Sequence, residues 1–375
     1  MKIIAFYLPQ FHSFPENDKW WGTGFTEWTN TKKSRPHYKG HYMPREPLND
    51  NYYCLLDKST FEWQINLAKE YGIYGFCFYH YWFGEDTILM KKPMELYLNN
   101  QDLDLPFCIS WANETWSRRW NGSDQDILIA QDYGTQETWI RHFEYLLDFF
   151  KDKRYIKVDG KPLFVLYKPE IFPDYKEMFK LWDTLAKKNG LPGITFAVQG
   201  AVWNNILDVD DSFVDYRIMY EPGYTACQSK DKKGLRFRIS TRILKELTKM
   251  SSGIKVNCLK PYGETCLNIV NRKVDSDKMI PGFFVNWDNT PRKGDAADSY
   301  IGSNPKVYEK YLSLLIKKAR EEYKKDIIFI NAWNEWAESC YLEPDKKFGY
   351  GYLEATKRAL IVNSEFPSFE DLQND

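Results

Sequence analysis

The sequence predicts an α/β protein, a single (β/α)8 barrel with long loops after the first and sixth strands. Two observations predict this fold: eight short apolar runs rich in Val, Ile, Phe and Tyr, and helix-like stretches between them. Most of the runs are continuous rather than alternating, as in parallel strands that are buried on both faces. We therefore expect residues 1–375 to form one barrel domain.

The expected strands and helices run along the whole chain. The strands are Ile3–Leu8, Ile73–Tyr79, Pro106–Trp111, Leu163–Tyr167, Ile194–Gln199, Phe213–Tyr220, Gly282–Trp287 and Ile327–Trp333. The helices, with apolar residues three or four apart, are Ser59–Tyr71, Thr135–Lys151, Tyr175–Asn189, Pro305–Lys324 and Tyr352–Val362. The alternative is an open doubly wound sheet, but no Gly-rich nucleotide loop follows the first strand.

Two connections are unusually long. Residues 9–58 join the first strand to the first helix, and residues 221–280, with a helix-like stretch Arg236–Lys249, join the sixth strand to the seventh. Connections of this length in a compact domain usually have a function, such as covering a site.

Composition excludes several classes of function. Lys and Arg number 51 against 52 Asp and Glu, which argues against broad binding to nucleic acid or to an anionic membrane. No apolar run reaches the roughly 18–20 residues of a membrane span, so we expect no membrane insertion. The N-terminal apolar stretch lacks a signal-peptide cleavage site. The seven cysteines are odd in number and show no two-residue spacing, which predicts free thiols and a cytoplasmic protein.

Aromatic residues are the most unusual feature of the composition. Trp, Tyr and Phe make up 17% of the chain, and the 14 Trp and 26 Tyr are more than a core easily uses, since each carries a polar atom. Such side chains suit a surface that is apolar on one side and wet on the other. Sugar rings are ligands of this kind.

In a (β/α)8 barrel the active site lies at the C-terminal ends of the strands. Aromatic, amide and acidic residues follow six of the eight expected strands, a composition that suits a carbohydrate substrate. The candidate substrate-binding residues at these ends and in the first long loop are Tyr7, Gln10, His12, Trp28, Tyr79, His80, Trp82, Asn113, Glu114, Trp116, Lys168, Tyr220, Glu221, Trp287, Asp288, Asn334 and Trp336.

The candidate catalytic residues are Glu335 and Glu338. Glycoside cleavage uses two carboxyl groups, and residues three apart on a helical turn project to the same side. Two acids in one pocket push their pKa values apart, as a proton donor requires. Glu114 is either part of the same site or in a structural ion pair, for example with Arg118 or Arg119.

The sequence predicts no metal site and no cofactor. The five histidines do not form a set with ligand spacing. Asp-x-Asp, a metal motif of some sugar transferases, occurs three times, and none of the three follows an expected strand: Asp102-Leu103-Asp104, Asp124-Gln125-Asp126 and Asp208-Val209-Asp210.

Four segments together resemble the WbsX-like family. They are Ala5–His12, Trp20–Trp28, Trp111–Glu114, and Asn331–Glu338 with Leu342–Asp345. Proteins of this family occur in bacterial O-antigen and capsular polysaccharide loci and are commonly labelled glycosyltransferases. The resemblance covers nearly the whole chain, to about residue 360.

That family is similar to glycoside hydrolase family 99, the endo-α-mannosidases. The similarity implies a (β/α)8 barrel and a Glu-Trp-x-Glu motif after the last strand. It further implies that Glu335 assists attack by the sugar 2-hydroxyl and that Glu338 protonates the leaving oxygen, with retention of configuration. The mannosidases have His where this chain has Ala337, so the motif does not specify mannose.

Three functions remain open. The first is a retaining hydrolase or transglycosidase that acts on an α-linked bacterial polysaccharide or oligosaccharide. The second is a glycosyltransferase that builds such a polysaccharide. The third is a non-catalytic sugar-binding barrel, although a binder needs no pair of acids. The expected partner is a carbohydrate rather than a nucleic acid, and the sequence carries no signal of oligomeric state.

Overall fold

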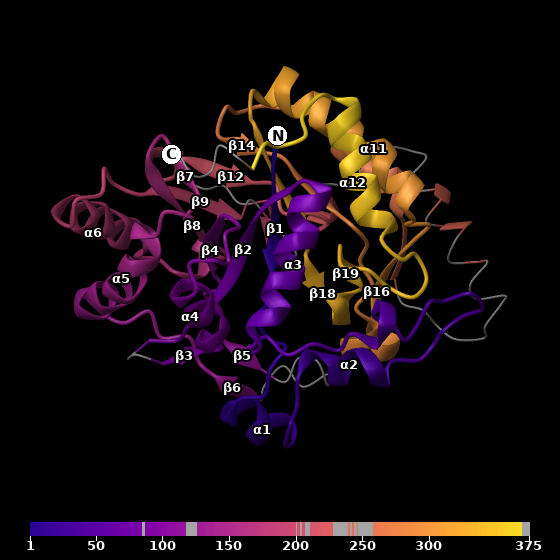
Figure 1. The fold of residues 1–375 in the computed structure, drawn as a ribbon, viewed down its shortest axis with the longest axis horizontal. Helices are drawn as coiled ribbons and strands as arrows, with labels where there is room; N and C mark the ends of the chain where they lie inside the picture. Colours follow the sequence, from indigo (N-terminus) through magenta and orange to yellow (C-terminus); the bar gives the residue numbers. More distant parts are fainter. Residues whose placement is uncertain are drawn as a thin grey trace.

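The computed structural model is an α/β barrel (Figure 1). The structure describes residues 1–84, 87–117, 126–199, 211–227 and 258–369, with short pieces between 201 and 246.

The parallel sheet follows the eight expected strands. Its strands are β1 (Lys2–Tyr7), β2 (Ile73–Trp82), β4 (Phe107–Trp111), β8 (Lys161–Leu166), β9 (Thr195–Gln199), β12 (Tyr216–Ile218), β14 (Met279–Ile280), β15 (Gly282–Phe284) and β17 (Ile327–Asn331). They pair in the order β14-β12-β9-β8-β4-β2-β1-β17-β15. The predicted barrel is thus confirmed.

The seventh strand position is divided between β14 and β15. β14 pairs with β12, β15 pairs with β17, and only Pro281 separates the two pieces. The ring of strands therefore closes through this residue. Gly282 follows at the tightest point, where a Cβ atom would lie 1.9 Å from the carbonyl oxygen of Met219, so a residue with a side chain does not fit.

Helices surround the sheet. They are α3 (Lys58–Tyr71), α4 (Lys91–Asn99), α5 (Gln136–Lys151), α6 (Tyr175–Lys188), α9 (Tyr262–Val270), α11 (Pro305–Lys318) and α12 (Gly351–Val362). The five expected helices are present, although the stretch after α11 is a π-helical turn, Ala319–Tyr323. α4 and α9 were not predicted because neither begins with a Ser, Thr, Asp or Asn cap. Arg236–Lys249 falls mostly outside the described residues.

The two long connections contain secondary structure of their own. The connection after β1 forms α1 (Pro15–Trp21) and α2 (Glu27–Lys33), and the one after β12 includes α7 (Gly223–Cys227), β13 (Cys258–Pro261) and α9. In Figure 1 the N-terminal end of β1 is at the top, whereas α1 and α2 lie at the bottom, with α1 beside β5 (Trp116–Ser117) and β6 (Ile127–Ile129). The first connection therefore covers the C-terminal end of the barrel.

The remaining strands are short and lie outside the main ring. They are β3 (Ile88–Leu89), β7 (Lys157–Val158), β10 (Ala201–Val202), β11 (Asn205–Ile206), β16 (Asp298–Ile301), β18 (Asn334–Glu335) and β19 (Cys340–Tyr341), and α10 (Thr290–Lys293) is a single turn.

The core uses more Trp and Tyr than we expected. Five tryptophans, Trp111, Trp182, Trp287, Trp333 and Trp336, are fully buried. Four of these rings, those of Trp111, Trp182, Trp333 and Trp336, pack against other rings; Trp336, for example, stacks on Tyr341 at 3.8 Å between centroids. Much of the aromatic excess is therefore core packing rather than sugar-binding surface.

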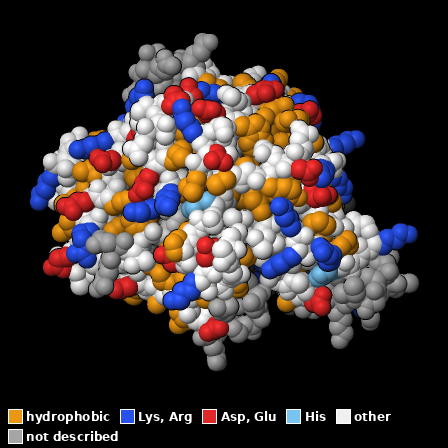
Figure 2. Space-filling model, turned by 60° about the horizontal axis from the view of Figure 1, so that its bottom comes forward, with side chains coloured by type: hydrophobic (Ala, Val, Ile, Leu, Met, Phe, Trp, Pro, Cys, Tyr) orange, Lys and Arg blue, Asp and Glu red, His pale blue; other side chains and the backbone are white. Residues whose placement is uncertain are grey.

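The surface and the cysteines agree with the composition. Figure 2 shows basic and acidic side chains interspersed on the face that it presents. Six of the seven cysteines, Cys54, Cys77, Cys108, Cys227, Cys266 and Cys340, are free thiols. Across the described residues no helix is both long and apolar enough to cross a membrane.

Candidate active site

A cavity of about 370 Å³ opens at the C-terminal end of the barrel. Nine of the candidate residues line it: Gln10, Tyr79, Glu114, Trp116, Lys168, Tyr220, Trp287, Glu335 and Glu338. The other residues that line it are Leu8, Tyr81, Ala112, Tyr167, Asn289, Arg292, Lys293 and Asp298. The cavity is therefore built from the ends of most strands, as in enzymes with this fold.

A buried turn brings the two candidate catalytic acids to the cavity. After β17 the chain forms β18, a 3-10 turn over Trp336–Glu338, and β19, which pairs with β18. Asn334 fixes the start of the turn, because its side chain accepts a hydrogen bond from the backbone N–H of Leu8 (2.8 Å) and donates one to the Leu8 carbonyl (3.0 Å). Trp336 packs below the turn, so Glu335 and Glu338 are left on the cavity wall.

Arg292 connects these acids to a third one. Its Nη1 donates to Glu338 Oε1 (2.5 Å), and its Nη2 donates to Glu335 Oε2 (3.1 Å). Its Nε and Nη2 both donate to Glu27 Oε1, at 3.0 and 2.5 Å. Three carboxylates therefore surround one guanidinium group in a site where all four side chains are at most 15% exposed.

Burial determines the electrostatics of the acid pair. It raises the pKa of Glu335, with the negative charge of Glu338 adding to the rise, and Arg292 opposes it only in part. Burial also raises the pKa of Glu338 against the lowering effect of Arg292. An ion pair with Arg would by itself argue against a proton donor. Here burial and mutual repulsion outweigh it, so the pair can hold a proton near neutral pH.

The opposite wall carries a second ion pair. Lys168 Nζ donates to Glu114. The two arginines that the sequence suggested as partners of Glu114, Arg118 and Arg119, lie outside the described residues. Asn113 holds the backbone of Lys168 from both sides: its side chain donates to the Lys168 carbonyl (2.8 Å) and accepts from the Lys168 N–H (2.7 Å). Asn113 therefore positions the wall from behind and does not line the cavity.

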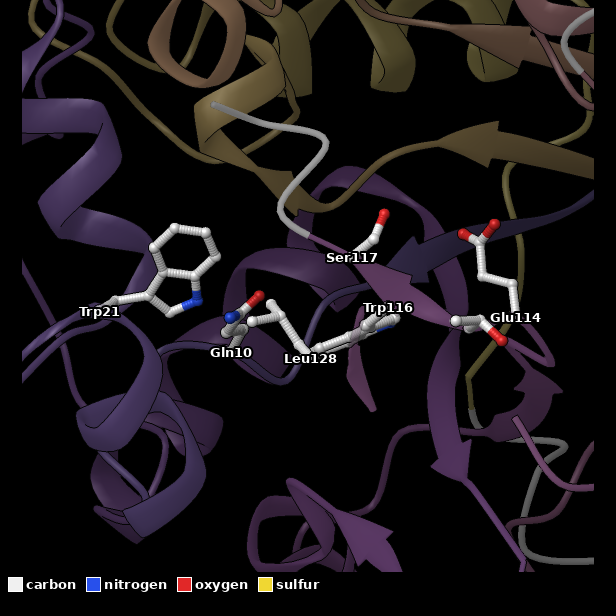
Figure 3. A pocket seen from close by; sticks show the side chains of 7 residues that line it. Gln10, Trp21, Glu114, Trp116, Ser117 and Leu128 are labelled. Carbon is white, nitrogen blue, oxygen red and sulfur yellow. The ribbon is translucent and has the colours of Figure 1, made fainter. Parts of the chain in front are cut away.

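A smaller hollow of about 110 Å³ adjoins the main cavity. It shares Gln10, Glu114 and Trp116 with that cavity and adds Trp21, Thr115, Ser117 and Leu128. Figure 3 shows Trp21 and Glu114 on opposite sides of it. The first long connection therefore contributes an aromatic ring to this edge of the site.

The two-residue period of a strand explains why some candidates lie elsewhere. β2 continues to Trp82, three residues beyond its expected end, and its successive side chains point to opposite faces. Tyr79 and Tyr81 line the cavity, whereas His80 shares a hydrogen bond with His142 on α5 (3.0 Å) and Trp82 stacks on the same imidazole. Burial lowers the pKa of His80 to about 3, so it packs as a neutral ring.

The same period places Tyr7 outside the barrel. Its hydroxyl donates to Gln64 on α3 (2.6 Å), while Leu8, its neighbour, lines the cavity. His12 donates through Nδ1 to the Pro9 carbonyl (3.0 Å), and burial lowers its pKa to about 4. Trp28 donates to the Tyr53 carbonyl (2.9 Å). These candidates shape the connection after β1.

Four further candidates act through other residues. Glu221 forms a buried ion pair with Arg272 and accepts from Thr225 (3.0 Å). Asp288 accepts from His41 Nε2 (2.7 Å), and its backbone N–H donates to the Glu338 carbonyl (2.7 Å). Asn334 and Trp336 hold the turn that carries the two acids. The structure thus places these four behind the cavity wall and not on it.

Sequence reasoning missed Arg292, the residue that contacts both acids. It lies in α10, a single turn after the seventh strand, and only its position four residues beyond Asp288 could have suggested it. Glu27 was missed because it lies far from any expected strand end. It does belong to Trp20–Trp28, one of the four segments that resemble the WbsX-like family. Tyr81 was missed because the strand was expected to end at Tyr79, so the alternation of faces that places Tyr81 beside Tyr79 was not extended to it.

No metal site is found in the described ranges. Within them no group of three or more His, Cys, Asp or Glu side chains could hold an ion. Asp102 and Asp104 pair with Lys58 and Lys69 on α3. Of the other two Asp-x-Asp motifs, residues 124 and 125 of the first and residues 208–210 of the second lie outside the described residues.

Comparison with known proteins agrees with this fold. Two WxcX proteins from Xanthomonas campestris pv. campestris, strains B100 and ATCC 33913, are both 33% identical, over 367 and 364 residues. Each match covers 96% of this chain and 49% of the relative, so the chain spans about half the length of these relatives.

Two solved structures share the fold. The GH99 endo-alpha-mannosidase from Bacteroides thetaiotaomicron superposes with a TM-score of 0.56 at 14% identity, over 100% of this chain and 98% of that one. A glycoside hydrolase-like protein gives 0.54 at 12% identity, over 96% of this chain and 93% of that one. At these identities the likeness shows the barrel fold alone.

The family match covers almost the whole chain. The family model described as Glycosyltransferase WbsX matches residues 3–356, which include every residue that lines the cavity. The chain therefore belongs to the Glycosyltransferase WbsX family.

Proposed function

We propose that this protein is a retaining glycoside hydrolase or transglycosidase that cleaves α-glycosidic bonds of a bacterial polysaccharide or oligosaccharide. One observation carries the proposal: Glu335 and Glu338 meet on the wall of one cavity, where burial raises both pKa values. Two carboxyl groups in one pocket, one of them able to hold a proton, are what glycoside cleavage requires. A binding protein has no need of such a pair.

The two acids would have different tasks. In the first step Glu335 accepts the proton of the sugar 2-hydroxyl, whose oxygen forms a bond to the anomeric carbon. The bond from that carbon to the leaving oxygen breaks, and Glu338 gives the leaving oxygen its proton. In the second step Glu338 takes a proton from water, which attacks the anomeric carbon, and Glu335 returns its proton to the 2-oxygen. Two inversions give net retention.

The raised pKa values support these tasks. A general acid must be protonated at the working pH, and a general base is most effective when its pKa lies near that pH. The Arg292 guanidinium favours the state in which only one of the two acids carries a proton, because it stabilises the other as a carboxylate.

The rest of the cavity suits a sugar. Trp116, Trp287 and Tyr220 offer ring faces or edges, and Gln10 and the pair of Glu114 with Lys168 offer hydrogen-bonding groups. We propose that the substrate is a neutral glycan that carries no nucleotide. We further propose that the protein acts in the cytoplasm, without a metal or a cofactor. The six free thiols support that location.

A glycosyltransferase is the second candidate. The description of the family favours it, and the named relatives contain about as much sequence again beyond the matched part. A transferase with this barrel would use the same two acids, with an activated sugar as the donor and a hydroxyl of the acceptor glycan in place of water. Incubation with nucleotide sugars and an acceptor glycan, followed by mass spectrometry, separates the two: transfer without hydrolysis supports the second candidate.

Leaving-group dependence tests the proposed roles. Fluoride leaves without protonation, so Glu338→Gln should retain the release of fluoride from α-glycosyl fluorides in the first step, measured in a single turnover, while it loses turnover of oligosaccharides. Glu335→Gln should lose both, because the 2-hydroxyl must still be activated. A crystal soaked with an α-configured aza-sugar should show both carboxyl groups at the anomeric position. Equal losses on both substrate types in Glu338→Gln would contradict the assignment.

A further inference from the structure

The connection after β1 carries a buried carboxylate that reaches the two acids. Glu27 is the first residue of α2, and its side chain is fully buried. α2 begins here because Thr26 and Thr29 form a capping box. The backbone N–H of Glu27 also donates to the carbonyl of Gln10 (3.1 Å), just past the end of β1. The start of this short helix is therefore fixed relative to the barrel.

Glu27 holds Arg292 by one edge. Its Oε1 accepts from both Nε and Nη2 of the guanidinium, whereas Glu338 and Glu335 each receive a single hydrogen bond. Because these two hydrogen bonds occupy Nε and one hydrogen of Nη2, Nη1 and the second hydrogen of Nη2 are left to donate to the two acids. The carboxylate of Glu27 therefore decides how the guanidinium is turned toward them.

The charges of Arg292 and the three acids around it do not balance. Three carboxylates face one guanidinium, and unpaired charge is costly in a buried site. Oε2 of Glu27 has no hydrogen-bond partner, so this side chain adds negative charge beside the two acids. The Glu27 charge raises the pKa of both Glu335 and Glu338, whereas the Arg292 charge lowers them. Glu27 therefore acts on the pair by position and by charge.

Other charged groups also face the acids. Lys293 lies on the same cavity wall and, like Arg292, lowers the pKa of Glu338, whereas Asp298 pairs with Lys260 (3.7 Å) and Lys168 pairs with Glu114. Burial raises the pKa values of Tyr79, Tyr81, Tyr220 and Cys340 well above their ordinary range. These last four groups therefore stay uncharged at neutral pH.

We infer that Glu27 is a positioning residue for the acid pair: its carboxylate orients Arg292 against Glu335 and Glu338 and places a further negative charge beside them. This role rests on the proposed function only for its catalytic consequence, since the electrostatic relation exists without substrate.

The alternative is that Glu27 and Arg292 merely hold α2 against α10. Two variants separate these roles. Glu27→Asp and Glu27→Gln both disturb the packing, but only Gln removes the charge. The acid pair stabilises the fold at low pH and loses that contribution as pH rises through its raised pKa values. The Asp variant keeps those values high, so between pH 6 and 9 its urea midpoint should fall further than that of Glu27→Gln.

If the urea midpoints of Glu27→Asp and Glu27→Gln fall by the same amount between pH 6 and 9, the inference is overturned. Arg292→Gln provides a second test if Glu27→Gln does not fold. It removes the opposing charge and should move the pH dependence to higher pH. Asp152→Asn is the matched control, because Asp152 forms a buried pair with Arg154 and contacts neither acid. It should leave the shape of the curve between pH 6 and 9 unchanged.

Turnover measurements then link the inference to function. Glu27→Gln should move the pH profile of glycan turnover down by about one pH unit, because Arg292 then acts on the pair unopposed. Asp152→Asn should not move it. If Glu335→Gln and Glu338→Gln keep full turnover while the two Glu27 variants still differ in stability, the proposed function fails and the role of Glu27 stands. An unmoved Glu27→Gln profile contradicts the role itself.

Discussion

Glu343 gives the most quantitative prediction of the structure. Its carboxyl group is buried behind the turn that carries Glu335 and Glu338, and it accepts hydrogen bonds from Trp336 Nε1 (2.6 Å), Gln64 Nε2 (2.7 Å) and the Tyr53 hydroxyl (2.9 Å). No Lys, Arg or His in the described part of the chain forms an ion pair with it. Burial raises its pKa from 4.5 to about 7, against the lowering effect of these donors.

The shifted pKa sets the size of the effect. Each tenfold change in proton affinity corresponds to about 1.4 kcal/mol, so ionisation of Glu343 costs the folded protein about 3 kcal/mol above pH 7. The sign follows from the direction: stability is present at low pH and is lost as pH rises through about 7. Glu343→Gln cannot ionise and should not show this loss.

Urea unfolding of both proteins between pH 4.5 and 8.5 measures the difference. At low pH the variant should be the less stable of the two, because the amide presents N–H groups to donors. With rising pH the gap should change by about 3 kcal/mol in favour of the variant. A gap that stays constant within about 0.5 kcal/mol would refute the assignment of a raised pKa to Glu343.

Three further predictions concern residues behind the cavity. Asn113→Ala removes both hydrogen bonds to the Lys168 backbone and should lower the free energy of unfolding by about 2–3 kcal/mol in urea titrations. A loss below about 1 kcal/mol would contradict the role of Asn113 in holding that backbone. Tyr7→Phe removes the hydrogen bond to Gln64 and should lower the free energy of unfolding by about 1 kcal/mol, while glycan turnover changes less than twofold. A large loss of turnover would indicate that Tyr7 contacts the substrate. His142→Phe should make the protein lose less stability between pH 6.5 and 4, because the lowered pKa values of His80 and His142 favour unfolding in acid; an unchanged acid transition in circular dichroism would count against this.

The strands could be predicted because burial on both faces leaves continuous apolar runs. Helices with caps and a regular apolar face, such as α5 with its capping box at Thr135, could be predicted for the same kind of reason. α4 could not, since its N-cap residue Met90 is in the left-handed region and carries no capping oxygen.

The candidate site could be predicted only in part. Strand ends identify which residues come near the cavity, and Glu335, Glu338 and Glu114 were found in this way. Which face a side chain takes depends on register, so His80 and Trp82 point to α5 while Tyr79 and Tyr81 point to the cavity. Arg292 and Glu27 depend on contacts across 265 positions of sequence, which no local pattern encodes.

The most direct test of the proposed mechanism is the anomeric form of the first product, followed by proton NMR on α-linked bacterial oligosaccharides with the wild type, Glu335→Gln and Glu338→Gln. The proposed mechanism predicts that the α-anomer appears first and that each variant loses about 100-fold or more in turnover. A β-anomer as the first product, or full turnover in both variants, would contradict it.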